Sequence, residues 1–281
     1  MPHQALDYTQ DEHPLPVLVY IHGGAFVGGS QTVRVGGREI YDGTNFVRSS
    51  IKLGQPILVV TINYRLGPLS FLASSELAAF NKSHGEAVGN YGLHDQRQAL
   101  IWVNKFIGGF GGDPENVTIY GTSAGAASCH YHSISPDRKF RRAVLSSATL
   151  FGIGPMPVQH HQRLFEQFKT ALVPDDQDPV KCLQGIPVQQ LVNAVPLSSY
   201  NPLLGRWIRE DRLHGIDDDL SPPDLMIGAC EYEVCPRSSI PPQSSHQSHP
   251  LTISSSSANS SKAPSPHHPS SPSSPTGSTA S

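Results

Sequence analysis

The chain has 281 residues, enough for one large α/β domain or two smaller ones, and its formal net charge is −3 at pH 7. This balance gives no electrostatic reason to expect nucleic acid or an anionic membrane as a partner. No stretch approaches the ~18 uninterrupted apolar residues of a transmembrane helix, and the polar, acidic residues 1–13 lack the apolar centre of a secretory signal. We therefore expect no membrane span and a cytoplasmic location by default, with secretion left open.

The composition changes abruptly near Pro236. From there to Ser281 the chain is mostly Ser, Pro, His and Thr, with few apolar residues. Such a segment cannot bury enough apolar surface to offset the entropy of ordering its backbone. We predict three parts: a flexible N-terminus over residues 1–13, a folded domain over residues 14–235 and a disordered tail over residues 236–281.

Five apolar runs within residues 14–235 predict β-strands. Each run is short and is bounded by Gly, Pro or polar residues, as expected of strands buried on both faces of a parallel sheet. In chain order they are Leu15–His22, Gln55–Asn63, Val117–Tyr120, Arg142–Ser146 and the weaker Asp224–Cys230.

Helical patterns lie between these strands. Apolar residues recur at three- and four-residue spacing through His94–Phe106 and Gln159–Leu172, and Pro187–Val195 is expected to form a short helix beginning on its proline. Strands that alternate with helices indicate an α/β fold, with a mostly parallel sheet covered by helices on both faces.

The segment Asn116–Ala126 reads N-V-T-I-Y-G-T-S-A-G-A and holds a chemically informative pattern. A β-rich run leads into Gly121, and Ser123 is followed by small residues that can begin a helix. This is the strand–turn–helix context of a G-x-S-x-G nucleophile elbow, in which side chains at Gly121 and Gly125 would crowd the bend. In such an elbow Ser123 is the nucleophile, and the N–H of Ala124 points to the position of the oxyanion.

The segment His22–Phe26, H-G-G-A-F, predicts the other half of an oxyanion hole. It lies at the carboxyl end of a predicted strand, where α/β sheets build their sites. Paired glycines allow backbone N–H groups to converge on one point without obstruction by Cβ atoms. Alone the segment could be a simple glycine turn, but together with G-T-S-A-G downstream it predicts Gly23 and Gly24 as oxyanion donors beside Ala124.

Three stretches resemble the type-B carboxylesterase (cholinesterase-like) family, in the same order. They are V-Y-I-H-G-G-A-F-V-G-G-S (Val19–Ser30), V-V-T-I-N-Y-R-L-G (Val59–Gly67) and the run from Gly89 to Ala126, which contains the nucleophile signature F-G-G-D-P-E-N-V-T-I-Y-G-T-S-A-G. The resemblance implies an α/β-hydrolase fold and hydrolysis of a small-molecule carboxylic ester through an acyl-serine intermediate, without a cofactor. Arg65, Asn90 and Asp95 match family positions that we expect to hold loops rather than to do chemistry.

The resemblance also implies the acid of the catalytic triad. In this family it is a Glu after a late strand in a G-x-x-x-x-E-G context, and Gly228–Val234 matches until its last residue, where Val replaces Gly. Glu233 is then the acid, following Ser123 in the order Ser, acid, His. Glu231 is the neighbouring choice. Thr122 is a second departure from the family pattern, because many members carry Glu at this position. The change removes no member of the catalytic triad.

A histidine base is missing from this pattern. His130 and His132 follow Ser123 by about two helical turns and are expected to point away from it. The histidines after Pro236 have no strand or apolar context that would fix them within hydrogen-bond reach of the serine. The family continues beyond the acid to a Gly-x-x-His segment and begins well before the H-G-G motif. We therefore expect a domain that is incomplete at its N- and C-terminal parts, as from an incomplete reading frame or a retained intron.

Two other interpretations are considered. A catalytically inactive cholinesterase-like binding module, or a non-functional fragment, would account for the missing base, although a strained elbow has a cost without catalysis. A shorter hormone-sensitive-lipase-like hydrolase would need an Asp and then a His in ordered strands, and no such histidine follows Asp217–Asp219.

The cysteines and tail histidines do not have the spacing of a metal site, so none is predicted. Without a secretory signal, the four cysteines are expected to be reduced. Cys129, beside the elbow, is predicted to be a small core residue.

Overall fold

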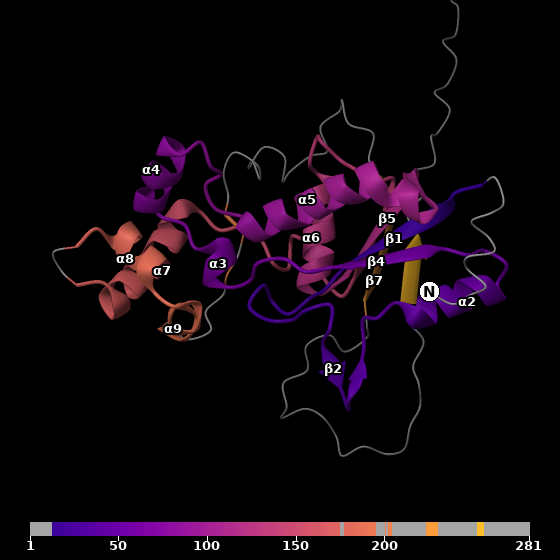
Figure 1. Ribbon diagram of the computed structural model, residues 1–281, viewed down its shortest axis with the longest axis horizontal. Coiled ribbons are helices and arrows are strands. Elements are labelled where there is room, and N and C mark those ends of the chain that lie inside the picture. Colours follow the sequence, from indigo (N-terminus) through magenta and orange to yellow (C-terminus); the bar gives the residue numbers. More distant parts are fainter. Residues whose placement is uncertain are drawn as a thin grey trace, which may run out of the picture.

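A computed structural model of the chain describes residues 13–174, 177–194, 200, 202–203 and 223–229, and the backbone of residues 252–255. These residues include a six-stranded sheet of order β4-β1-β5-β6-β7-β8 (Figure 1). Its neighbouring strands are parallel, except that β8 is antiparallel to β7. The strands are β1 (Leu15–Ile21), β4 (Leu58–Ile62), β5 (Gly112–Thr122), β6 (Arg142–Ser146), β7 (Asp224–Ala229) and β8 (Thr252–Ser255).

The five predicted strands are present, with shifts at their ends. The largest shift is at β5, which begins at Gly112 because this residue already pairs with Leu15 of β1, ahead of an irregularity in the register. A separate two-stranded ribbon, β2 (Arg34–Val35) and β3 (Arg38–Glu39), was not predicted.

Strand β8 lies in the segment whose composition predicts disorder. Its residues Thr252 and Ile253 are β-branched, and the edge of a strand such as β7 offers unpaired backbone groups to a neighbour. A composition averaged over residues 236–281 does not register so short a run. The rest of that segment and residues 1–12 lie outside the described residues, so the disorder expected there stays a prediction.

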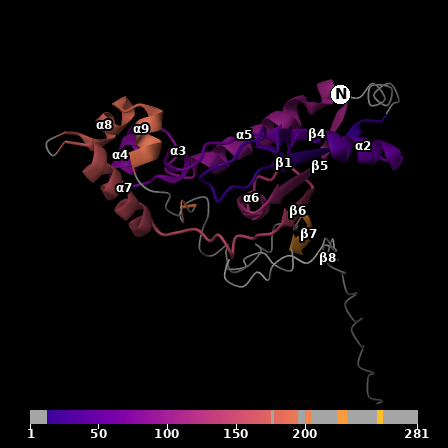
Figure 2. The same ribbon diagram turned by 90° about the horizontal axis from the view of Figure 1, so that it is seen from below.

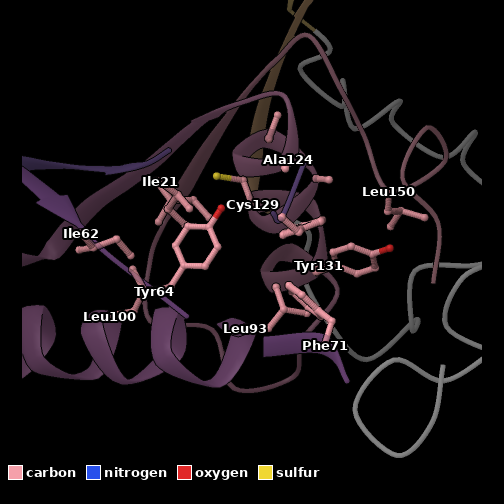
Figure 3. Packing of buried hydrophobic residues seen from close by; sticks show 14 of the residues in the cluster. Ile21, Ile62, Tyr64, Phe71, Leu93, Leu100, Ala124, Cys129, Tyr131 and Leu150 are labelled. Carbon is pink, nitrogen blue, oxygen red and sulfur yellow. The ribbon is translucent and has the colours of Figure 1, made fainter. Parts of the chain in front are cut away.

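Two helices, α5 (Tyr91–Phe106) and α6 (Ala124–Ser133), cover one face of the sheet. Alternate residues of β1 point toward them, and Val17, Val19 and Ile21 are at most 1% exposed. Figure 3 shows Tyr64 and Ile21 packed between the two helices, with the sulfur of Cys129 pointing toward them. Cys129 is a free, buried thiol, so its predicted place in the core is confirmed.

The opposite face is covered by α2 (Thr44–Lys52), which lies across the strands from α5 in Figure 1. The ring of Phe46 on α2 contacts Tyr120 of β5, with the ring centroids 5.9 Å apart. Tyr120 and Leu18 are only half-buried on this side. Helices therefore lie on both faces of a mostly parallel sheet, as the alternation of strands and helices predicts.

The other α-helices lie together at one end of the molecule, beyond the sheet (Figures 1 and 2). Among the described residues, none of the helices is long and apolar enough to cross a membrane. Helices α4 and α8 begin at side-chain caps, with Ser74 accepting from the N–H of Leu77 and Asp178 from that of Val180. The helices at this end of the molecule are α3 (Pro68–Phe71), α4 (Ser75–Ser83), α7 (Val158–Leu172), α8 (Pro179–Gly185) and α9 (Val188–Ala194).

Candidate active site

Ser123 occupies the turn between β5 and α6. Its backbone has φ 56° and ψ −126°, a conformation that L-residues rarely adopt and that costs about 1–3 kcal/mol. Two hydrogen bonds hold it there. The Ser123 N–H donates to the Ser146 carbonyl of β6 over 2.9 Å, and its own carbonyl accepts from the N–H of Ala127 in α6 over 3.0 Å. The strained elbow predicted around this serine is therefore present.

The two glycines of the elbow permit close backbone contacts. A Cβ atom on Gly121 would lie 2.2 Å from the carbonyl carbon and oxygen of Gly125. One on Gly125 would lie 2.1 Å from the carbonyl oxygen of Ile21, at the end of β1. Any side chain at either position would force α6 away from the sheet, which is the crowding expected of G-x-S-x-G.

The H-G-G segment lies directly beside the elbow. A Cβ atom built on Gly23 would lie 3.1 Å from Cβ of Ser123 and 2.5 Å from the Thr122 carbonyl oxygen. This proximity follows from the parallel pairing of β1 with β5, in which Ile21 stands opposite Gly121. Residues that lie about a hundred positions apart in the chain therefore meet at the carboxyl ends of two adjacent strands.

The residues after Gly23 form a tight turn. Gly24, Ala25 and Phe26 all have positive φ angles, of 108°, 53° and 62°. The Gly24 carbonyl accepts from the N–H groups of Val27 and Gly28, each over 3.0 Å. Gly24 and Ala25 are exposed, whereas the Phe26 ring is buried and packs edge-on against Phe71. The turn is thus anchored by one aromatic side chain and leaves the backbone of Gly24 and Ala25 accessible.

Thr122, the residue where the family often carries Glu, bonds to a tyrosine. Its side chain hydrogen-bonds with the Tyr20 hydroxyl. Burial raises the pKa of Tyr20, and the hydrogen bond with Thr122 partly offsets that increase. Both residues line a cavity of about 230 Å³ on the face of the sheet that α2 covers, together with the rings of Tyr41 and Tyr120. Thr122 is therefore part of the packing below the elbow.

Two histidines near Ser123 in sequence have other partners. Nδ1 of His130 accepts from the Leu150 N–H over 3.4 Å, and its ring packs edge-on against Phe151. Nε2 of His132 lies 2.9 Å from Oε1 of Gln96, and burial lowers the pKa of His132 to about 3. Both side chains therefore have partners within the fold other than Ser123.

Three polar residues matched to the family hold loops, as predicted. Arg65 makes a two-pronged ion pair with Asp95, with both nitrogen–oxygen distances 2.8 Å. Burial alone would raise the pKa of Asp95, but the hydrogen bonds from Arg65 outweigh it and lower that pKa. Asn90, with φ 55°, precedes α5, and its side chain bonds both the N–H and the carbonyl of Leu203.

Several predicted site residues lie outside the described residues. They include Glu233, its neighbour Glu231 and the histidines that follow Pro236, so the acid remains a prediction. Among the residues that are described, no three His, Cys, Asp or Glu side chains gather in a way that could hold a metal ion.

The parallel sheet, the helices on both faces and the serine turn between β5 and α6 define an α/β-hydrolase fold. A solved structure with this fold is the carboxylesterase EST55 of Geobacillus stearothermophilus. It is 33% identical, with a TM-score of 0.64 over 78% of this chain and 44% of that one. The family model of the carboxylesterase family matches residues 1–248. The chain belongs to the carboxylesterase family.

Relatives of known name include fungal lipases. Lipase 2 of Geotrichum candidum is 42% identical over 152 residues, which cover 53% of this chain and 25% of the lipase. The secreted triacylglycerol lipase LIP1 of Gibberella zeae is 32% identical over 243 residues, covering 81% of this chain and 38% of the lipase. The chain therefore spans about a quarter to two-fifths of the length of these relatives.

Proposed function

We propose that this chain carries the nucleophile and the oxyanion hole of a carboxylic-ester hydrolase. The observation that carries the proposal is the strained backbone of Ser123 at a strand-to-helix turn, with Gly23 packed against it. Strain of this kind persists only where the surrounding structure holds it, and it gathers at functional sites. The names of the relatives, lipases and a carboxylesterase, favour an ester as substrate.

In the proposed reaction, Oγ of Ser123 attacks the carbonyl carbon of the ester, and the π electrons of that carbonyl move to its oxygen. The N–H groups of Gly23, Gly24 and Ala124 donate to this oxyanion, helped by the positive end of α6. Collapse of the intermediate breaks the bond to the alcohol oxygen, and the alcohol leaves with the proton that the Ser123 hydroxyl lost on attack. Water then cleaves the acyl-serine and releases the acid.

We assign Glu233 as the acid that would orient a histidine base, on the strength of the family context alone. No described histidine is assigned as the base. His130 and His132 have other partners in the fold, and His22 belongs to the oxyanion loop. With an oxyanion hole but no placed base, a serine hydrolase keeps about 10³-fold acceleration over water. We therefore expect simple esters to be hydrolysed slowly, with an acceleration of this order over water.

Labelling with a fluorophosphonate probe, followed by intact mass, tests the proposal. We expect one phosphonyl adduct, formed slowly on the folded chain and lost in Ser123→Ala. Ser83→Ala, which changes an exposed serine at the end of α4, should keep the adduct. Rapid labelling would contradict the prediction that this chain places no histidine base beside Ser123. An unlabelled chain would contradict the proposal and favour a non-catalytic binding module.

A further inference from the structure

The imidazole of His22 has one fixed position at the end of β1. It is 1% exposed and stacks on the ring of Tyr64, with centroids 4.5 Å apart and planes 18° from parallel. The Tyr64 hydroxyl donates to the backbone carbonyl of His22 over 2.8 Å. Tyr64 therefore holds both the ring and the backbone of His22.

The ring makes a hydrogen bond to the next residue in the chain. Nδ1 lies 2.8 Å from the carbonyl oxygen of Gly23. A carbonyl oxygen can only accept, so Nδ1 carries the proton and donates. Nε2 is then an acceptor, and it makes no hydrogen bond to the part of the chain that the structure describes. Burial lowers the pKa of His22, although the bond to Gly23 opposes this, so the ring is neutral near pH 7.

This bond determines the orientation of a peptide group beside Ser123. The carbonyl of Gly23 and the N–H of Gly24 belong to one planar trans peptide, so they point in opposite directions. Gly29 passes close to this hydrogen bond, because a Cβ atom on Gly29 would lie 2.7 Å from the Gly23 oxygen and 2.8 Å from Nδ1 of His22. Two successive glycines could otherwise adopt many backbone conformations. Holding the Gly23 carbonyl therefore fixes the direction of the Gly24 N–H.

We propose that His22 is a positioning residue of the oxyanion hole: by holding the Gly23 carbonyl, it aims the Gly24 N–H at the oxyanion formed when Ser123 attacks. The inference rests on the proposed function, in which Gly24 is one of the donors. In this role His22 acts through the Gly23 carbonyl and not on the substrate itself.

A purely structural role would favour a different side chain. A buried nitrogen without a partner lowers stability, so a hydrocarbon ring stacked on Tyr64 would fill the same space without that cost. What the imidazole adds is a donor for the Gly23 carbonyl. Phe at this position should therefore keep the packing and lose the alignment of Gly24.

The test compares three variants of the full chain in their second-order rate of fluorophosphonate labelling and in their thermal midpoint. His22→Phe keeps the stacked ring and removes the donor, so we expect labelling slower by about 10- to 100-fold, below the loss seen when an oxyanion donor is deleted outright. His22→Asn places an amide N–H near the position of Nδ1 and should restore the rate to within about fivefold of the unsubstituted chain.

Tyr64→Phe is the matched control. It keeps the stacked ring and the Nδ1 bond but removes the hydrogen bond to the His22 carbonyl, so it should lower the midpoint while the rate changes by less than about threefold. The inference is overturned if His22→Phe labels as fast as the unsubstituted chain. It is equally overturned if His22→Asn is as slow as His22→Phe.

If the unsubstituted chain does not react, the proposed function fails, and the inference is judged on the backbone instead. In a chain labelled with ¹⁵N-glycine, the heteronuclear NOE of the Gly24 amide should fall in His22→Phe and be retained in His22→Asn. An unchanged NOE in His22→Phe would show that the imidazole does not hold this peptide.

Discussion

Replacing Gly125 with Ala should destabilise the fold, because α6 approaches β1 more closely at this residue than a side chain allows. The added Cβ would lie 2.1 Å from the Ile21 carbonyl oxygen, 2.9 Å from the His22 carbonyl oxygen and 3.0 Å from its carbonyl carbon. All three are backbone atoms, of the last residue of β1 and of the first residue of the H-G-G turn, so no side-chain rotation can relieve the contact. The start of α6 would have to move outward by about 1 Å to restore normal van der Waals distances.

Overpacking of this kind costs about 1–3 kcal/mol, and the rigidity of the contacting backbone favours the upper end, about 3 kcal/mol. At about 2–4 °C per kcal/mol for a domain of this size, the midpoint of thermal unfolding should fall by about 6–12 °C. Because Ser123 precedes α6 directly, fluorophosphonate labelling should fall as well.

Thermal unfolding followed by circular dichroism measures this change, with Gly108→Ala as the matched control. A Cβ atom on Gly108 meets nothing within 4 Å, and its φ is not positive, so this variant should unfold within about 2 °C of the unsubstituted chain. Equal midpoints for Gly125→Ala and Gly108→Ala would refute the close approach of α6 to β1.

Three further changes have definite expected outcomes. Ser123→Gly should be more stable to urea than Ser123→Ala by about 1 kcal/mol, since glycine relieves the positive φ; equal stability would argue against strain. For His132, the folded pKa of about 3 lies below the ordinary 6.5, so stability is complete above pH 6.5 and is lost as pH falls toward 3. Between pH 7 and 5 the free energy of unfolding of the unsubstituted chain should fall by up to ~1.4 kcal/mol per pH unit more than that of His132→Gln. Urea unfolding at each pH measures this, and the same pH dependence in both chains would contradict it. Ser74→Ala removes the cap that accepts from Leu77 and should lower the free energy of urea unfolding by about 1 kcal/mol; an unchanged value would show that the cap does not stabilise α4.

Local sequence was sufficient for the strands and the elbow. Each predicted strand is a continuous apolar run, and continuous runs of this length are read directly from residue order. The G-T-S-A-G turn could be predicted just as locally, because Gly121, Ser123 and Gly125 lie within five consecutive residues. The core position of Cys129 followed from its place on the helix after the elbow. These features need no knowledge of distant parts of the chain.

Other features depended on partners far away in sequence. Strand β8 forms where a short β-branched run meets the edge of β7, which no average over residues 236–281 can register. Helix α2 was not predicted, and its Phe46 contacts Tyr120, a residue of a strand much later in the chain. Helices α4 and α8 begin after Ser74 and Asp178, which are N-cap residues whose type alone predicts a helix start.

In the candidate site, too, some features follow from local sequence and others from the tertiary structure. Ser123, Gly23, Gly24 and Ala124 were named from sequence because each lies in a motif with its own local geometry. Their meeting was decided by the tertiary structure, since the parallel register of β1 and β5 places Gly23 against Ser123. The sequence placed His22 only within the loop. The bond from the His22 ring to the Gly23 carbonyl joins neighbouring residues, but the ring is held by stacking on Tyr64, which follows β4. That contact arises from the parallel pairing of β1 with β4, because the partners of a buried side chain are set by three-dimensional contacts rather than by spacing along the chain.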